Sequence, residues 1–274
     1  MLIENFPTGG AEQDDAIILR ELGIPYERML CGAFSESDPD KFYLIGNFTA
    51  LTDMAKASLF AMGNYTIYEH DYKFHPSRNP MAFKDLVVPR EERTNIKFYE
   101  CARKVICVGH MQAHIFSKND ISKNVVVTGG SFWSDKELDY IDFLREDRKK
   151  KGLKESVALH SNHAPLKGPE VIKKFLELQG KSYEFIERLP HEEFLYKLSR
   201  HTSFGFFPLT PETCSRVIVE AKMMEMELIV RGFIGATYEP WYQLNGKELI
   251  KYCRTEMKNT ALKVIRDSIY PYVL

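Results

Sequence analysis

The sequence Pro-Glu-Thr-Cys-Ser-Arg-Val-Ile-Val-Glu-Ala at residues 211–221 predicts a helix that begins after a strand and carries two glutamates. Thr210 is a natural N-cap and Pro211 a natural first helical residue, because proline has the φ that this position needs. The three amides after Pro211 would then lie free at the positive end of the helix, where a phosphate binds. Eight helical residues separate Glu212 and Glu220 by about 12 Å. That spacing matches the span from the sugar to the ribose of a nucleotide-sugar.

Apolar side chains surround the second glutamate of this pair. Glu220 lies between Val219 and Ala221, so a carboxylate that is only solvated is less favourable there than on most helix faces. The alternative is that Glu212 only stabilises the helix dipole and Glu220 only lies on an exposed face. We favour a functional role for the pair.

The same alternation of short apolar strands and longer amphipathic helices extends through the whole chain, which is typical of α/β architecture with parallel sheets. Strands are predicted over 1–6, 42–45, 65–68, 104–108, 124–127, 157–160, 183–186, 204–207 and 227–230. Helices are predicted over 12–22, 51–62, 94–102, 111–116, 169–179, 191–199, 211–224 and 246–269.

The length of 274 residues suits two domains better than one core. We place the boundary at 150/151, giving domains 1–150 and 151–274, because the charge-rich stretch Ser134–Leu153 resembles a linker or a solvated helix face. A substrate- or membrane-facing role for that stretch is the alternative. We expect the helical tail to cross back and brace the first domain.

Composition narrows the class of protein. The net charge of −1 argues against a nucleic-acid surface, and five scattered cysteines without a CxxC pair argue for a reducing compartment and against a cysteine-built zinc site. No apolar leader or membrane-spanning run is apparent. We therefore expect a cytoplasmic protein without nucleic-acid partners or a transmembrane segment, and peripheral membrane contact stays open.

Ligands of parallel α/β sheets bind at the carboxyl ends of the strands, so the loops after strands are the candidate sites. Gly9 and Gly10 follow the first strand and would allow close backbone approach, although a plain turn is the alternative. His70 and Asp71 follow a later strand and could bind a sugar hydroxyl or move a proton, unless they are ordinary loop residues. Lys167, at a strand-to-helix turn, is a positive charge for a leaving diphosphate or simply a surface lysine.

Together these loops resemble the retaining nucleotide-sugar glycosyltransferases of the GT-B fold, in the family marked by a Glu-x7-Glu motif (glycosyltransferase family 4-like, "glycosyl transferases group 1"). The likeness covers most of the chain in order, through the segments 6–12, 70–71, 101–108, 125–130, 167–168 and 212–220. It implies two Rossmann-like domains facing each other across a cleft. It also implies transfer of a sugar from a UDP-, GDP- or ADP-sugar to a carbohydrate or other glycan acceptor, with retention of anomeric configuration.

The resemblance implies roles on the donor side. Lys167 would hold the diphosphate, Glu220 would accept hydrogen bonds from the ribose, and Glu212 would lie beside the transferred sugar. The distal phosphate would be held by the backbone amides near the helix start, those of Thr213, Cys214 and Ser215. On the acceptor side, Gly10 would approach that phosphate and His70 would contact the sugar near the reacting carbon, which makes Glu212 and His70 the catalytic candidates.

The chain departs from the family pattern in two places. The family's arginine about six residues before the lysine is replaced here by Ser161, and the segment Glu212–Ser215 lacks the family's glycines. Neutralisation of the diphosphate is therefore one positive charge short. We hypothesise that Arg216 supplies it.

In the path usually described for such enzymes, the leaving phosphate itself helps to deprotonate the acceptor. No dedicated catalytic base is then required. We also predict an enzyme that needs neither a cofactor nor a metal ion. One alternative is a non-catalytic GT-B-like domain that binds a nucleotide-sugar or a partner protein. Others are a nucleotide-sugar epimerase and, least favoured because no GxGxxG follows the first strand, a nicotinamide-dependent enzyme.

Overall fold

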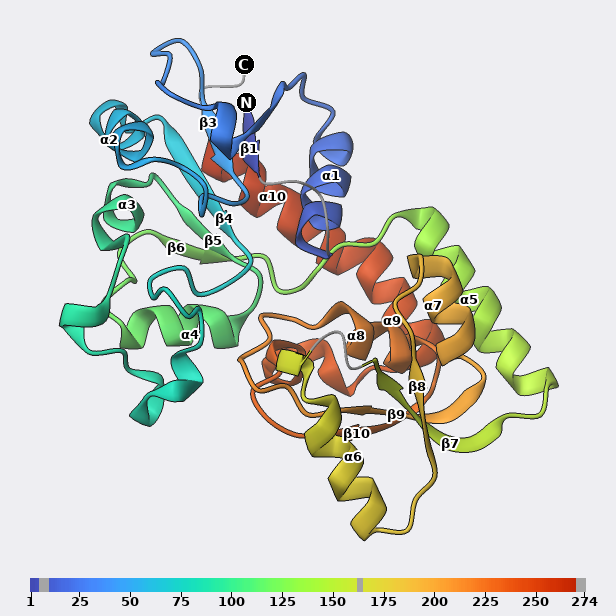
Figure 1. Cartoon of the computed structure of the whole chain (residues 1–274). Helices are drawn as coiled ribbons and strands as arrows, with labels where there is room; N and C mark the ends of the chain where they lie inside the picture. The colour runs from blue at the N-terminus through green and yellow to red at the C-terminus, as the bar shows by residue number, and fades with distance from the viewer. Residues whose placement is uncertain (5–9, 162–164, 270–274) are drawn as a thin grey trace. The chain divides into compact units, whose positions relative to one another are not determined.

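The computed structural model describes residues 1–4, 10–161 and 165–269, and the chain forms two compact units (Figure 1). Unit 1 comprises Met1–Phe132 and Glu256–Leu274, and unit 2 comprises Trp133–Thr255. Each unit is built around one wholly parallel sheet. The predicted α/β class with two Rossmann-like sheets is confirmed.

The sheet of unit 1 has six strands in the order β2-β1-β3-β4-β5-β6. All residues of its central strands β3, β4 and β5 are buried, as expected for parallel strands covered on both faces, and most of them are apolar or aromatic. The short edge strand β2 was not predicted, because its sequence Arg-Met-Leu is only partly buried and lacks an apolar run. The strands are β1 (Leu2–Glu4), β2 (Arg28–Leu30), β3 (Tyr43–Ile45), β4 (Tyr65–Glu69), β5 (Val105–Cys107) and β6 (Val125–Val127).

Local signals set the helices of unit 1. In α2, Thr52 caps the start by accepting the Ala55 amide at 3.1 Å, and Gly63 ends the helix with a φ of 63°. The helices of this unit are α1 (Gly10–Leu22), α2 (Asp53–Met62), α3 (Ile96–Cys101), α4 (His110–Lys118) and α10 (Lys258–Ile269).

The C-terminal helix α10 belongs to unit 1, as predicted. It contacts α1, β4 and β6, and in Figure 1 it lies alongside α1. The hydroxyl of Thr66, on β4, donates to the carbonyl of Ser268 at 3.0 Å. A π-helical turn, Cys253–Met257, interrupts the single tail helix that the sequence predicts.

The sheet of unit 2 has four strands in the order β10-β9-β7-β8. Its core packs β7 against α6 through Val157, Leu159, Ile172, Leu176 and Phe207. The strands are β7 (Lys154–His160), β8 (Tyr183–Ile186), β9 (His201–Phe206) and β10 (Glu227–Val230). The helices are α5 (Asp135–Lys150), α6 (Pro169–Leu178), α7 (His191–Leu198), α8 (Arg216–Met223) and α9 (Gly246–Tyr252).

The units divide the chain at 132/133 rather than at the predicted 150/151. The charge-rich stretch forms α5, whose buried Leu138, Ile141 and Leu144 lie on the side that packs against α7, α8 and α9. Ser134 begins the helix with a complete capping box, and Arg148 donates to two carbonyls of the β9 region at 2.6 Å. Of the two interpretations of this charge-rich stretch, a linker or a solvated helix face, the structure shows a helix, and the apolar residues between its charges pack it into unit 2.

None of the helices within the described ranges is long and apolar enough to cross a bilayer. All five cysteines lie in those ranges, and none of them forms a disulfide there.

Candidate functional site

Two predicted site residues meet at the carboxyl edge of the unit 2 sheet. Lys167 follows β7 and Glu212 follows the neighbouring strand β9, and the Lys167 Nζ lies 2.6 Å from the Glu212 Oε1. Gly168 allows the turn that carries Lys167 to lie close to the backbone of Phe207, because a Cβ at its φ of 70° would lie 1.8 Å from the Phe207 carbonyl oxygen. Pro169 is the first residue of α6, as predicted.

The predicted start of α8 at Pro211 is wrong, because the helix begins at Arg216. The backbone of Glu212 instead pairs with the segment after β10: its amide donates to Phe233 at 2.9 Å, and its carbonyl accepts from Gly235 at 2.7 Å. A Cβ on Gly235 would lie 1.9 Å from the Thr213 oxygen, so glycine permits this pairing. The local helix signal is thus overridden by tertiary pairing, and the 12 Å spacing predicted along one helix axis does not apply.

Ser215 occupies the N-cap of α8 in a left-handed conformation, with a φ of 68°. Its hydroxyl oxygen is buried and has no hydrogen-bond partner among the described residues. The preceding Cys214 is buried and its carbonyl accepts the Ala236 amide at 3.2 Å. An unpaired hydroxyl beside the positive end of a helix is a feature that an anion can satisfy.

Glu220 is buried, and its contacts converge on one oxygen. Oε1 accepts from the Trp133 indole and from the His191 Nε2, each at 2.9 Å. Within the described part of the chain, no residue donates to Oε2. Burial raises the pKa of Glu220, but the hydrogen bond and charge of His191, with Arg216 and Trp133, outweigh burial and hold the pKa below its ordinary value. Glu220 is therefore a fixed carboxylate at neutral pH.

Arg216 lies within the same cluster. Its Nη2 is 2.9 Å from the Glu137 Oε1, its guanidinium lies 4.8 Å from the centre of the Trp133 ring, and 10% of its side chain is exposed. To reach a diphosphate, Arg216 would have to leave Glu137. The Arg216 charge, which we hypothesised to neutralise the diphosphate, is thus paired with Glu137 of α5.

His160, at the end of β7, stacks on Phe194 with ring centroids 5.2 Å apart. Burial lowers its pKa to about 4, and the positive charge of Lys167 contributes. His160 is therefore neutral at pH 7 and packs among the rings of Phe194, Phe204 and Phe206. Its neighbour Ser161 is buried, and the next three residues lie outside the described ranges.

In unit 1, His70 directly follows β4 and pairs with a residue that the sequence did not mark as part of the site. Its Nε2 lies 2.8 Å from the Asp15 Oδ1 of α1, and both side chains are buried. Burial lowers the pKa of His70, but the carboxylate of Asp15, with Asp14, outweighs burial and raises the pKa above its ordinary value. Gly10 is the first residue of the same helix, and the predicted Gly9 lies outside the described residues.

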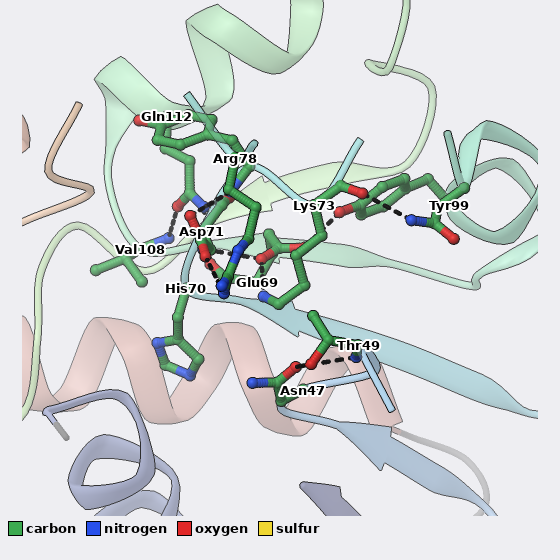
Figure 2. A network of polar contacts seen from close by, with 12 residues as sticks. Asn47, Thr49, Glu69, His70, Asp71, Lys73, Arg78, Tyr99, Val108 and Gln112 are labelled. Atoms are coloured by element: carbon green, nitrogen blue, oxygen red, sulfur yellow. Dashed lines mark hydrogen bonds and ion pairs between the residues drawn. The ribbon is translucent and has the colours of Figure 1, made fainter. Parts of the chain in front are cut away.

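A buried polar network lies next to His70, which points away from it (Figure 2). Glu69 pairs with Lys73, accepts the Tyr99 hydroxyl at 2.5 Å and accepts the Asp71 amide at 2.8 Å. The predicted Asp71 itself binds Arg78 at 3.0 Å. The network fixes the backbone from which His70 projects.

The His70–Asp15 pair makes stability depend on pH. Because the folded pKa of His70 lies above its unfolded value of about 6.5, its contribution is fully present below about pH 6.5 and is lost as pH rises through the folded pKa. We expect the advantage of wild type over Asp15→Asn in the free energy of unfolding to shrink between about pH 6 and about pH 9. Urea unfolding at both values measures this, and an advantage that stays constant or grows would contradict the assignment.

Within the described ranges, no group of three or more His, Cys, Asp or Glu side chains could hold a metal ion. The sequence contains one Asp-x-Asp, at Asp38 and Asp40, in the loop before β3. There the Asp38 Oδ1 accepts the Asp40 amide at 2.9 Å, which makes it a local turn.

Comparison with solved structures identifies the fold. Anabaena HepE, in complex with UDP and glucose, is similar with a TM-score of 0.57 at 14% identity, over 99% of this chain and 95% of HepE. A glycosyltransferase from Rickettsia africae is similar with a TM-score of 0.53 at 12% identity, over 99% of this chain and 93% of that one. AviGT4, a glycosyltransferase involved in avilamycin A biosynthesis, gives 0.50 at 11% identity, over 99% of this chain and 97% of AviGT4.

The chain has the GT-B fold. No protein-family model matches the sequence, and no curated protein does. At these identities the likeness establishes the fold alone, so the reaction must be argued from the side chains.

Several polar residues of this GT-B chain were missed in the sequence. Asp15 lies on a helix among other acidic residues, and nothing local marks it as the partner of His70. Glu69 and Lys73 are an i,i+4 pair, which would have been a signal on a helix but is not one across the turn after β4. His191 carried a partial signal, because it follows a strand and a proline.

Proposed function

We propose that this chain is a glycosyltransferase that moves a sugar from a nucleoside diphosphate donor to a glycan acceptor, with retention of anomeric configuration. The observation that carries the proposal is the convergence of Lys167 and Glu212 from two adjacent strand ends, at 2.6 Å. Support also comes from the GT-B fold, which HepE uses with UDP and glucose bound. UDP is therefore the first nucleotide to test.

The donor site would use unit 2. The Lys167 ammonium would move from the Glu212 carboxylate to the diphosphate, leaving Glu212 to accept from the hydroxyls of the transferred sugar. The distal phosphate would lie at the N-terminus of α8, where the buried Ser215 hydroxyl has no partner among the described residues. Glu220 would use Oε2 for the ribose, since Oε1 is already engaged.

Unit 1 would contribute the acceptor side. His70, oriented by Asp15, would lie near the reacting carbon, and Gly10 at the start of α1 would let the backbone approach the phosphate. Asp71 is fixed by Arg78 and by the turn after β4, so we assign it a role in holding that turn.

Negative charge builds on the departing diphosphate as the glycosidic bond breaks and the anomeric carbon becomes oxocarbenium-like. Lys167 and the amides at the start of α8 would stabilise that charge. Arg216 is bound to Glu137, so we assign the second electropositive contribution to the helix end rather than to the guanidinium. In a retaining front-face path the leaving phosphate takes the acceptor proton, so the protein need not supply a base.

A donor panel tests the proposal. UDP, GDP and ADP should be compared by thermal shift, and UDP-glucose with the matching GDP- and ADP-sugars should be assayed for release of the nucleoside diphosphate. We expect one nucleotide to stabilise the protein by mass action and its sugar to be turned over. Binding without release from any sugar, with a mixed glycan acceptor present, would instead favour a non-catalytic nucleotide-sugar-binding domain.

Turnover is expected to be independent of divalent metal, because Lys167 and the helix end would supply the positive charge at the diphosphate. Activity in excess chelator should equal the untreated rate. A rate that vanishes in chelator and returns with Mn²⁺ would refute this part of the proposal.

A further inference from the structure

His191 reaches the Glu220 carboxylate from a different element of unit 2. It is the first residue of α7, whereas Glu220 lies in the second turn of α8. The His191 Nε2 lies 2.9 Å from Oε1, the oxygen that the Trp133 indole also contacts. Two donors thus hold one oxygen of a buried carboxylate and leave the other unengaged by described residues.

The charges around His191 favour its protonated form. Glu220 faces its Nε2, and the Glu137 Oε1 of α5 lies 3.8 Å from its Nδ1. Arg216 pairs with Glu137 and lies 3.7 Å from Glu220, so two carboxylates face two cations when His191 is protonated. Burial lowers the pKa of His191, but the hydrogen bond and charge of Glu220 outweigh burial and raise it. Trp133 is the remaining donor of the cluster and carries no charge.

We infer that His191 is the positioning residue for ribose recognition: it fixes Oε1 of Glu220 so that Oε2 is presented to the 2′- and 3′-hydroxyls of the donor nucleotide. The inference rests on the proposed function, which assigns the ribose to Glu220. A carboxylate held at one oxygen cannot rotate freely, so it loses less conformational entropy when it accepts hydrogen bonds from a diol. Neutral His191 could still donate through Nε2, but its Nδ1 lone pair would then face the Glu137 carboxylate, which weakens the arrangement.

The inference predicts a selective loss of ribose recognition. UDP and 2′,3′-dideoxy-UDP should be compared by calorimetry, with the GDP and ADP pairs beside them, in wild type, His191→Phe and His191→Gln. Wild type should prefer the ribose form by about tenfold or more, the value of a hydrogen bond to a charged group. His191→Phe should reduce the preference to about twofold by weakening only the ribose form, and His191→Gln, which keeps an N–H donor, should restore most of it.

Controls separate positioning from folding. Glu193→Gln, an exposed position on the same helix, should keep the wild-type preference. In wild type the preference should also fall as pH rises above the raised pKa of His191, and in His191→Gln it should not. Equal weakening of both nucleotides by His191→Phe would mean a structural role and would overturn the inference.

Two outcomes distinguish this inference from the proposed function. If wild type prefers the ribose form and His191→Phe keeps that preference, the inference fails and the glycosyltransferase proposal stands. If wild type binds no nucleoside diphosphate, the proposed function fails and the inference fails with it.

Discussion

Lys167→Met is expected to lower donor turnover by about 100- to 1,000-fold, the usual cost of removing one group that stabilises charge developing in a transition state. The lysine lies in the turn between β7 and α6, 2.6 Å from Glu212, and we propose it as the cation that stabilises the leaving diphosphate. Its removal also leaves the Glu212 carboxylate uncompensated beside a growing negative charge. The effect should fall on kcat more than on KM, because the charge on the leaving group is larger in the transition state than in bound donor.

The matched control is Lys173→Met, on the following helix. Lys173 is also a partly exposed lysine with a carboxylate neighbour, Glu170 at 3.8 Å, but it lies in the second turn of α6. The turnover of Lys173→Met should equal that of wild type. Lys167→Arg should recover part of the activity, since charge is kept and geometry is changed. A near-normal kcat in Lys167→Met would show that Lys167 does not stabilise the leaving diphosphate.

Lys73→Met is expected to lower the free energy of unfolding by about 3–5 kcal/mol, because it leaves the buried Glu69 carboxylate without its cation. Both side chains are almost fully buried, at 4% and 0% exposure. The Tyr99 hydroxyl and the Asp71 amide still donate to Glu69, but neither carries a positive charge. Urea unfolding followed by circular dichroism measures the change.

A second substitution tests the cause. Adding Glu69→Gln to Lys73→Met removes the orphaned charge while keeping an acceptor for Tyr99, so the double variant should be more stable than the single one. Lys41→Met breaks an exposed pair with Glu27 in the same unit and should leave the unfolding midpoint near wild type. A double variant less stable than Lys73→Met would show that packing, not charge, sets the loss.

Periodicity in the sequence was enough to predict most of the fold. The strands β8 and β10 and the start of α6 lie where apolar runs, glycine and proline place them. The start of α8 could not be predicted, because the proline at 211 gives a valid local signal that loses to pairing of Glu212 with Ile234, a residue on a later loop. Local signals of this kind do not indicate pairing with residues far along the chain.

The candidate site divides in the same way. Lys167 and Glu212 follow strands that are neighbours in the sheet, so topology brings them together once the strand order is known. Asp15 and Trp133 contribute through side-chain geometry alone, and no spacing links either of them to His70 or Glu220. The part of the site that follows strand ends was predictable, and the residues that orient it were not.

The return of α10 to unit 1 sets an order for folding during translation. Unit 2 is a continuous insertion, Trp133–Thr255, whereas unit 1 needs both sides of it. The hydrogen bond from Thr66 to Ser268 spans 202 residues, so the sheet of unit 1 cannot gain this helix until synthesis has passed residue 268. Of the two units, the one whose synthesis starts earlier is therefore the later to complete its core, and until then β4 and β6 lack the helix that packs on them.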